Sequence, residues 1–167
     1  MARGQSRSVA CAVACVVGAP GCSAILDWDP KPDAGPDPTA CTYKEPNDAI
    51  ATPQPLVVGD VGPAAICPAA DRDFYAFNVP ADGATVTLRI TFDDAAMQDL
   101  DMNLYVASTG MLLSQGVSFN MPEERIVCPG VSPNCSALTM GDYVLEVFGA
   151  GPATFNTYAI ELSIVGP

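Results

Sequence analysis

The sequence predicts an all-β domain, an antiparallel β-sandwich of about eight short strands, between residues 41 and 167. Three observations predict it. Apolar residues alternate with polar ones in several short runs, turn residues separate those runs, and no long window has the 3.6-residue period of a helix. Alternation with a period of two places one face of a strand in a core and the other in water. Several such strands joined by short turns are typical of a sandwich.

Five runs show this alternation, and they span residues 73–79, 85–92, 99–106, 142–148 and 157–165. The run 85–92 is the clearest, because every second residue in it is apolar: Val86, Leu88, Ile90 and Phe92. Residues typical of turns lie between the runs, at 80–83, 108–110, 140–142 and 149–153. Each run therefore predicts a strand with one face in the core and one in water.

Residues 22–40 precede the predicted domain and differ from it in composition. Four prolines and four aspartates fall between Ser23 and Ala40, a composition that opposes both a helix and a packed core. Proline-rich segments stay extended, at about 3.1 Å per residue. We therefore expect residues 22–40 to form a tether in front of a domain of residues 41–167.

Residues 1–21 predict a cleaved targeting segment. Arg3 and Arg7 are followed by an apolar run too short to span a bilayer, and Gly21 precedes Cys22. This arrangement resembles a bacterial lipoprotein signal, which implies that Cys22 is acylated and becomes the first residue. A lipidated Cys15 and an ordinary secretory signal are the alternatives. In each case an exported protein is expected.

The lipid on Cys22 is the membrane contact that we expect, because no segment after it has 18 consecutive apolar residues. Each buried methylene contributes about 0.8 kcal/mol, so several acyl chains would hold the protein firmly. By resemblance to lipoprotein sorting, Ser23 after the cysteine favours the outer membrane of the cell envelope.

Four cysteines follow Cys22, and an even number in an oxidising compartment predicts two disulfides. Three connectivities are open. We predict Cys41–Cys67 and Cys128–Cys135, because each of these pairs closes a local loop. A metal site built from the same cysteines is the competing interpretation, but the chain has no CxxC pair and no histidine to complete one.

The charge and the missing histidines exclude several classes of protein. A net charge of −12 repels phosphate backbones, so no nucleic-acid partner is expected. Without histidine, Ser-His-Asp and Cys-His catalytic arrangements cannot be built. Asp99 and Asp101 form a carboxylate pair of the kind that glycosidases use. No sugar-stacking tryptophan accompanies them, so a solvated or turn-stabilising role is preferred, and we predict that the protein is not an enzyme.

Five motifs follow one another along the chain: Glu45-Pro46-Asn47-Asp48, "DRDFYAF" at 71–77, "DLDMNLY" at 99–105, "GDYVLEV" at 141–147 and "NTYAI" at 156–160. Together they resemble the bacterial pre-peptidase C-terminal domain, over essentially all of residues 41–167. That family is also similar to the collagen-binding modules of secreted bacterial collagenases. The resemblance implies a jelly-roll-like β-sandwich.

The resemblance also implies a calcium site. In calcium-binding relatives, the Glu-Pro-Asn-Asp segment and the acidic turn before the Tyr-x-Phe strand supply oxygen ligands, of which calcium takes six to eight. The residues that match are Glu45, Asn47, Asp48, Asp71 and Asp73. At two further positions where the collagenase modules place acids, this chain has Tyr43 and Ala70, so the implied site is depleted.

A purely structural role for these residues is the alternative. Asn47 and Asp48 are residues that cap turns through their own backbone. The two later acids could cap a strand or pair with Arg72 or Arg125. The Cys41–Cys67 disulfide would already join the segments that calcium joins in the relatives, which would make the metal redundant.

Taken together, these features predict a non-catalytic, membrane-tethered, extracytoplasmic binding or accessory module, with calcium as its cofactor if the acidic cluster binds metal. The expected partner is a protein or polysaccharide at the cell surface, and the chain is expected to be a monomer. Candidate contact residues on the wet faces of the sheets are Tyr105, Phe119 and Phe148. The alternative is a chaperone-like or inhibitory accessory subunit of an exported peptidase encoded elsewhere.

Overall fold

A computed structural model describes residues 39–93, 98–119, 121–130 and 135–166 of the chain. The predicted signal peptide, Cys22 and all but the last two residues of the predicted tether lie outside the described residues. Within those described ranges, no helix is long and apolar enough to cross a membrane.

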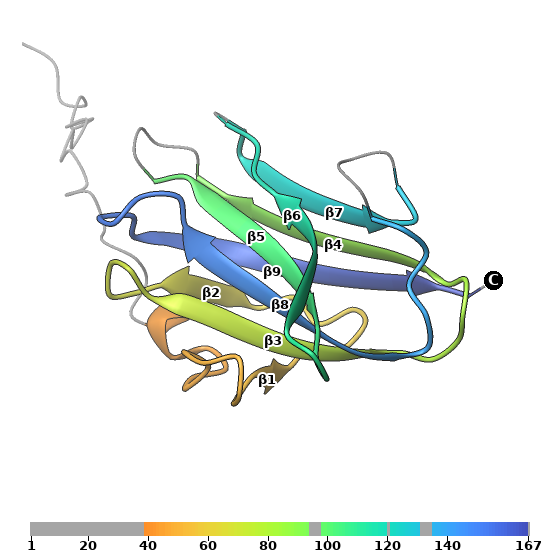
Figure 1. Cartoon of the computed structure of the whole chain (residues 1–167). Coiled ribbons are helices and arrows are strands. Elements are labelled where there is room, and N and C mark those ends of the chain that lie inside the picture. Colours follow the sequence, from red (N-terminus) through yellow and green to blue (C-terminus); the bar gives the residue numbers. More distant parts are fainter. Residues whose placement is uncertain (1–38, 94–97, 120, 131–134, 167) are drawn as a thin grey trace, which may run out of the picture. The chain divides into compact units, whose positions relative to one another are not determined.

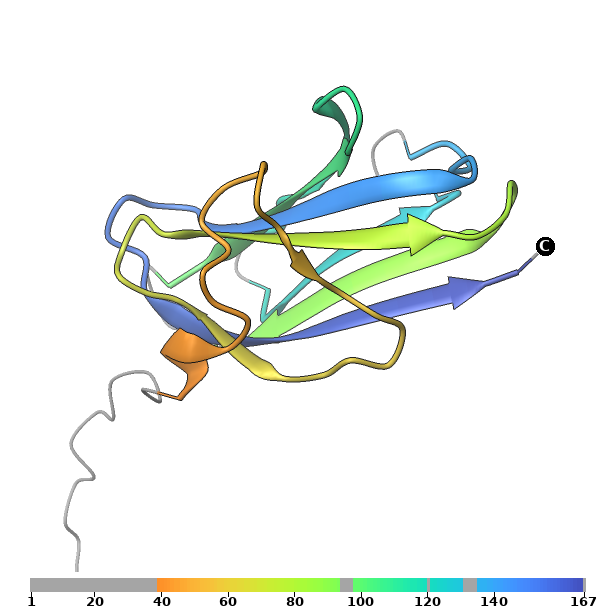
Figure 2. The ribbon, with the colours of Figure 1, turned by 90° about the horizontal axis from the view of Figure 1, so that it is seen from below.

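Two β-sheets pack face to face in the domain (Figures 1 and 2). The five-stranded sheet has the order β1 (Gln54–Pro55), β3 (Arg72–Val79), β8 (Gly141–Gly149), β5 (Leu100–Val106) and β6 (Met111–Gly116). The four-stranded sheet has the order β2 (Pro63–Ile66), β9 (Asn156–Val165), β4 (Thr85–Phe92) and β7 (Glu123–Cys128). Neighbouring strands are antiparallel except for the short β1–β3 pair, which is parallel. The predicted antiparallel β-sandwich is therefore confirmed.

The five runs predicted from alternation are the strands β3, β4, β5, β8 and β9, with each end within one residue of its predicted position. Four further strands, β1, β2, β6 and β7, bring the described total to nine, where about eight were expected. β1 and β2 are too short to show a period. In β7 the alternation is hidden in the sequence, because Glu124 occupies an inward position and is fully buried.

Alternation places the apolar face of each long strand between the two sheets. In β4 the inward residues Val86, Leu88, Ile90 and Phe92 are all buried, whereas the threonines between them are not. Leu145 and Leu104 bring matching apolar side chains from the five-stranded sheet into the same core. Burial of a side chain of this size contributes about 1.5–3 kcal/mol, so this core is the main source of stability.

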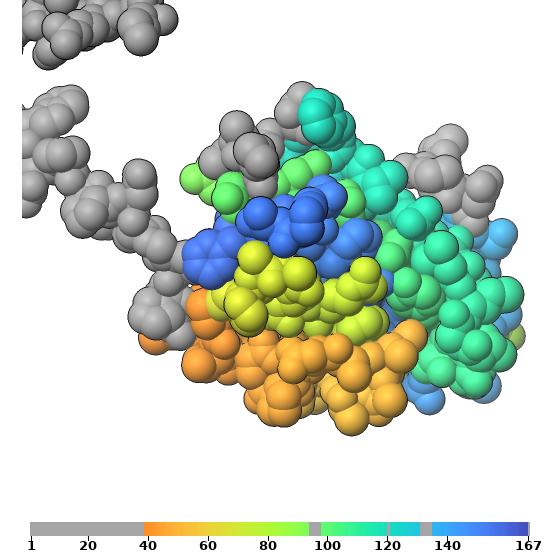
Figure 3. Space-filling model, turned by 60° about the vertical axis from the view of Figure 1, so that its left-hand side comes forward, coloured from red at the N-terminus to blue at the C-terminus, as the bar shows by residue number. Residues whose placement is uncertain are grey.

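The chain enters the sandwich at one of its ends. A short 3-10 helix, η1 (Ala40–Thr42), contacts β2, and the predicted disulfide joins Cys41 of η1 to Cys67, the residue after β2. Residues 40–60 then pass along the β3 side of the domain, as Figure 3 shows in orange. There the N–H of Phe74 donates to the carbonyl of Asn47 at 2.9 Å. The other predicted disulfide, Cys128–Cys135, is also present.

Candidate metal centre

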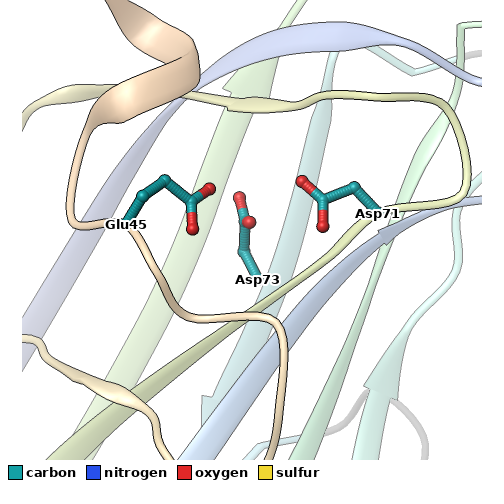
Figure 4. A group of neighbouring side chains, drawn as sticks. All are labelled: Glu45, Asp71 and Asp73. Atoms are coloured by element: carbon teal, nitrogen blue, oxygen red, sulfur yellow. The ribbon is translucent and has the colours of Figure 1, made fainter.

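Three carboxylates meet at the end of the sandwich where the chain enters. Glu45 follows η1, Asp71 lies in the β2–β3 connection, and Asp73 is on β3. One oxygen from each lies within 4.8 Å of the others. Figure 4 shows Asp73 between the two, with the three carboxylates turned toward one another. Segments separated by more than 20 residues thus place three negative charges together.

Asp73 is the buried member of this cluster, at 1% exposure. The alternation of β3 points it inward on the same face as Tyr75. Its Oδ2 accepts a hydrogen bond from the Tyr158 hydroxyl, and the Tyr75 hydroxyl lies 3.4 Å from the same oxygen. Burial raises the pKa of Asp73 to about 7. The Tyr158 hydrogen bond lowers that pKa, and the charges of Asp71 and Glu45 raise it further.

Asn47 lies beside these acids and is fully buried. Its backbone N–H donates to Glu45 Oε2 at 2.9 Å. One terminal atom of its carboxamide is 2.7 Å from Glu45 Oε2 and 3.1 Å from Asp73 Oδ1. If that atom is the nitrogen, it donates to both carboxylates. If it is the oxygen, three oxygens converge on one point, and a cation between them is needed to offset their repulsion.

Asp71 and Glu45 form the more accessible side of the cluster. Asp71 accepts the N–H of Cys67 at 3.2 Å and the N–H of Arg72 at 2.7 Å. Burial raises the pKa of Asp71, these two N–H groups lower it, and the charge of Asp48 raises it. Burial likewise raises the pKa of Glu45, the Asn47 N–H lowers it, and the charges of Asp71 and Asp48 raise it. All five residues predicted as ligands are thus brought together, with exposed Asp48 at the rim.

No basic side chain among the described residues compensates these acids. Lys44 pairs with Asp60 and donates to the carbonyl of Pro55 at 2.6 Å. Arg72 pairs with Glu146 on the outer face of the five-stranded sheet. The proposed alternative, in which Asp71 or Asp73 pairs with an arginine, is therefore not what the described ion pairs show. The strand-capping alternative holds in part, since Asp71 accepts the N–H of Arg72, the first residue of β3.

The donor set suits a hard cation. It offers carboxylate and carboxamide oxygens and neither imidazole nor thiolate, which is the ligand chemistry of calcium. Calcium–oxygen bonds of 2.3–2.6 Å place opposite ligands about 5 Å apart. One oxygen each from Glu45, Asp71 and Asp73 lies within 4.8 Å of the others, so all three are close enough to contact one ion. These three residues and Asn47 would hold the ion, with Asp48 and water completing its shell.

The two positions that depart from the collagenase pattern supply no ligand. The Tyr43 hydroxyl donates to Asp60 Oδ1 at 2.8 Å, away from the cluster. Its ring occupies the space next to Gly62, where any Cβ would lie 2.3 Å from ring atoms. Ala70 has a left-handed backbone, with φ of 71°, in the connection that delivers Asp71.

Two of the three predicted contact residues, Tyr105 and Phe148, contact the same ion pair of Arg72 and Glu146. The Tyr105 hydroxyl donates to Glu146 Oε2 at 2.8 Å, and the Phe148 ring lies under the guanidinium of Arg72, 5.5 Å from ring centroid to carbon. Both are partly buried by these contacts. Phe119 is 81% exposed in the β6–β7 connection.

Of the predicted carboxylate pair, Asp99 precedes β5 and Asp101 is the second residue of that strand. The pKa of Asp101 is raised to about 6, by burial first and by the charge of Asp99 second. Tyr75 and Tyr158 were not among the predicted site residues, although both contact Asp73. The available signal was a tyrosine at an inward position of a strand, because a buried hydroxyl needs a hydrogen-bond partner.

No protein-family model matches the chain, and no curated protein matches it in sequence. Among solved structures it is similar to the pre-peptidase C-terminal domain of collagenase from Bacillus anthracis, with a TM-score of 0.51 and 14% identity over 65% of this chain and 92% of that chain. It also matches PliG of Aeromonas hydrophila, a periplasmic lysozyme inhibitor of g-type lysozyme, with a TM-score of 0.40 and 10% identity over 65% of this chain and 94% of that chain. The first similarity shows that the domain has a β-sandwich fold like that of a pre-peptidase C-terminal domain.

Proposed function

We propose that the protein is an exported, non-catalytic binding or accessory module, tethered through a lipid on Cys22, and that a calcium ion stabilises its sandwich. The observation that carries the calcium site is the carboxylate cluster of Glu45, Asp71 and Asp73, which no described basic side chain neutralises. The expected ligand is a protein or polysaccharide at the cell surface.

Several features support an exported accessory module. Two disulfides fit an oxidising compartment. The missing histidines remove the common catalytic arrangements. The solved structure with the similar fold is itself a domain of a collagenase. A tethered sandwich of this kind is suited to presenting a binding face away from the membrane.

The ion would act as a clamp. Its ligands come from the segment after η1, from the β2–β3 connection and from β3, so one ion would join three parts of the chain. It would also neutralise carboxylates that burial and mutual repulsion destabilise. Binding to the folded state alone stabilises it by mass action, and the size of the effect follows the calcium concentration.

Isothermal titration of calcium into the chelator-treated whole chain, with Cys22→Ser to prevent acylation, tests the proposal. We expect one saturable site and a higher melting temperature in calcium. Asp73→Asn should abolish both effects. Asp142→Asn is the matched control, because Asp142 is exposed and bonds Asn78 at the other end of β3. If the parent chain shows no binding heat and no shift in melting temperature, the metal site is contradicted.

The binding role has a separate test. The folded protein would be applied to immobilised collagen, peptidoglycan and polysaccharide, each with calcium and with chelator. Saturable retention on one of them supports a binding module. Absence of retention on all of them would leave the accessory role to a soluble protein partner, which cross-linking in cells would identify.

A further inference from the structure

Two buried tyrosines from opposite sheets meet behind the acidic cluster. The hydroxyl oxygens of Tyr75 on β3 and Tyr158 on β9 are 2.7 Å apart. The Tyr158 hydroxyl donates to Asp73 Oδ2. The Tyr75 hydroxyl also hydrogen-bonds the carboxamide of Asn47. The pair therefore contacts Asp73 and Asn47, the two most buried members of the cluster.

The direction of these hydrogen bonds follows from counting protons. Each hydroxyl has one proton to donate and can also accept. Because Tyr158 gives its proton to Asp73, Tyr75 can give its own to Tyr158, and the Tyr75 oxygen is then free to accept from Asn47 Nδ2. That bond turns the Asn47 oxygen toward Glu45 and Asp73. If Tyr75 instead donates its proton to the Asn47 oxygen, the Asn47 nitrogen faces the acids and donates to them.

The tyrosines also divide the oxygens of Asp73. Oδ2 is held by the Tyr158 hydroxyl, whereas Oδ1 faces the Asn47 carboxamide and the rest of the cluster. A carboxylate fixed in this way presents a single oxygen to an ion. Without the hydroxyl, Oδ2 would be a buried acceptor with a weakened set of partners, and the carboxylate would be free to rotate.

We propose that Tyr158 and Tyr75 are positioning residues for the cation: Tyr158 orients Asp73, and Tyr75 holds Asn47 with its oxygen toward the ion. This inference rests on the calcium site proposed above. Neither hydroxyl is itself a ligand. Since Tyr158 belongs to the four-stranded sheet and Asp73 to the five-stranded sheet, ion binding is coupled to the packing of the two sheets.

Calcium titration of the whole chain carrying Cys22→Ser, with Tyr158→Phe or Tyr75→Phe added, tests this. Loss of a group that orients a metal ligand costs about 10-fold to 100-fold in affinity, and we expect each variant to weaken calcium binding by that range. Tyr143→Phe is the control, because Tyr143 is equally buried and its hydroxyl donates to the carbonyl of Thr139, 2.9 Å away. It should leave the calcium affinity unchanged.

The outcomes are distinct. If Tyr158→Phe and Tyr75→Phe bind calcium as the parent does and only lower the melting temperature, equally with and without calcium, their role is structural and the inference is overturned. If the parent chain binds no calcium, both the site and the inference fall.

Terbium luminescence covers the case in which a variant folds poorly. In the parent chain carrying Trp28→Phe, tyrosines are the only aromatic groups that can transfer excitation efficiently to the ion. We expect tyrosine-excited terbium emission that calcium displaces. Absence of that emission in a chain that binds terbium would place the ion away from the tyrosine pair and overturn the inference.

Discussion

Arg72 forms an ion pair with Glu146 of β8 and not with Asp71 or Asp73, the acids on either side of it in the sequence. The β3–β8 register places Arg72 opposite Phe148, and its guanidinium lies over that ring. Alternation then directs the Arg72 side chain outward and that of Asp73 inward. The acids of the cluster therefore lack this arginine as a partner, because it pairs with Glu146.

This arrangement predicts that Arg72→Ala lowers the free energy of unfolding without weakening calcium binding. Glu146 is 1% exposed and would keep hydrogen bonds from Asn103 and Tyr105 only. Loss of one charged hydrogen bond, screened because Arg72 is exposed, should cost about 1–2 kcal/mol in the free energy of unfolding. Calcium affinity should not fall. Urea unfolding and calcium titration check the two parts, and Arg125→Ala, on the outer face of the other sheet, is the control. A marked loss of affinity would mean that Arg72 shapes the cluster.

The pKa of Asp73 predicts opposite pH dependences with and without calcium. An acid whose folded pKa is about 7, against an ordinary value of 3.8, stabilises the fold at low pH and loses that contribution as pH rises through 7. In chelator, the melting temperature should therefore fall between about pH 4 and pH 7. In calcium, the stabilisation should grow over the same window, because the ion needs the deprotonated carboxylate.

Other raised acids share this sign, so Asp73→Asn isolates the effect. The variant should show a shallower fall in chelator and no calcium stabilisation at any pH. Differential scanning calorimetry at matched calcium concentrations measures both. A calcium effect that is constant across the window would contradict the assignment of Asp73 as a ligand.

The sequence predicted the long strands well because their residues obey one rule. β3, β4, β5, β8 and β9 each bury every second residue, and alternation is visible without any tertiary information. β6 was missed because it is an edge strand in which Met111 and Leu112, although apolar, are exposed. β7 was missed because an acid fills an inward position. Such strands are defined by their partners and not by their own pattern.

The candidate site was predicted in its members but not in its organisation. The family resemblance named Glu45, Asn47, Asp48, Asp71 and Asp73, and the fold brings all five together. Local sequence could not show that Tyr158 would reach Asp73, since that contact depends on two sheets packing face to face. Local sequence also could not show that Arg72 would form its ion pair with Glu146.

Glu124 offers a second pH-dependent prediction, at a site away from the metal cluster. Its side chain is fully buried, and one oxygen accepts the N–H of Ser118 at 2.6 Å. Within the described residues the other oxygen has no hydrogen-bond partner. Burial raises the pKa of Glu124 to about 7, the Ser118 bonds lower it, and the charges of Asp101 and Asp99 raise it.

Glu124→Gln should therefore raise the melting temperature at about pH 8, where it removes a buried charge, and change it little at about pH 5. Glu123→Gln is the control, because Glu123 is more exposed and pairs with Arg89 on the outer face. Thermal unfolding of the three proteins at both pH values is the measurement. An equal shift at the two pH values would show that the gain comes from shape and not from charge.

The Cys41–Cys67 disulfide and the proposed ion join the same two segments, which predicts that they act cooperatively. Cys67 donates its N–H to Asp71, and Cys41 lies in η1, just before Glu45. By chain entropy, the Cys41–Cys67 disulfide, with a sequence separation of 26, stabilises the folded state by about 3.5 kcal/mol. The Cys128–Cys135 disulfide, with a separation of 7, contributes about 2.4 kcal/mol.

Replacing Cys41 and Cys67 by serine should lower stability by about that amount and also weaken calcium binding, because the ligand segments are then held together for only a fraction of the time. Replacing Cys128 and Cys135 should lower stability without changing calcium affinity. Cys128 pairs with Val86 at one end of β4, whereas Tyr158, which contacts Asp73, pairs with Phe92 at the other end. Calcium titration at a temperature where all three proteins are folded decides the matter. If both replacements leave the affinity unchanged, η1 and the β2–β3 connection are held in place without the disulfide, and the ion and the disulfide stabilise the domain independently.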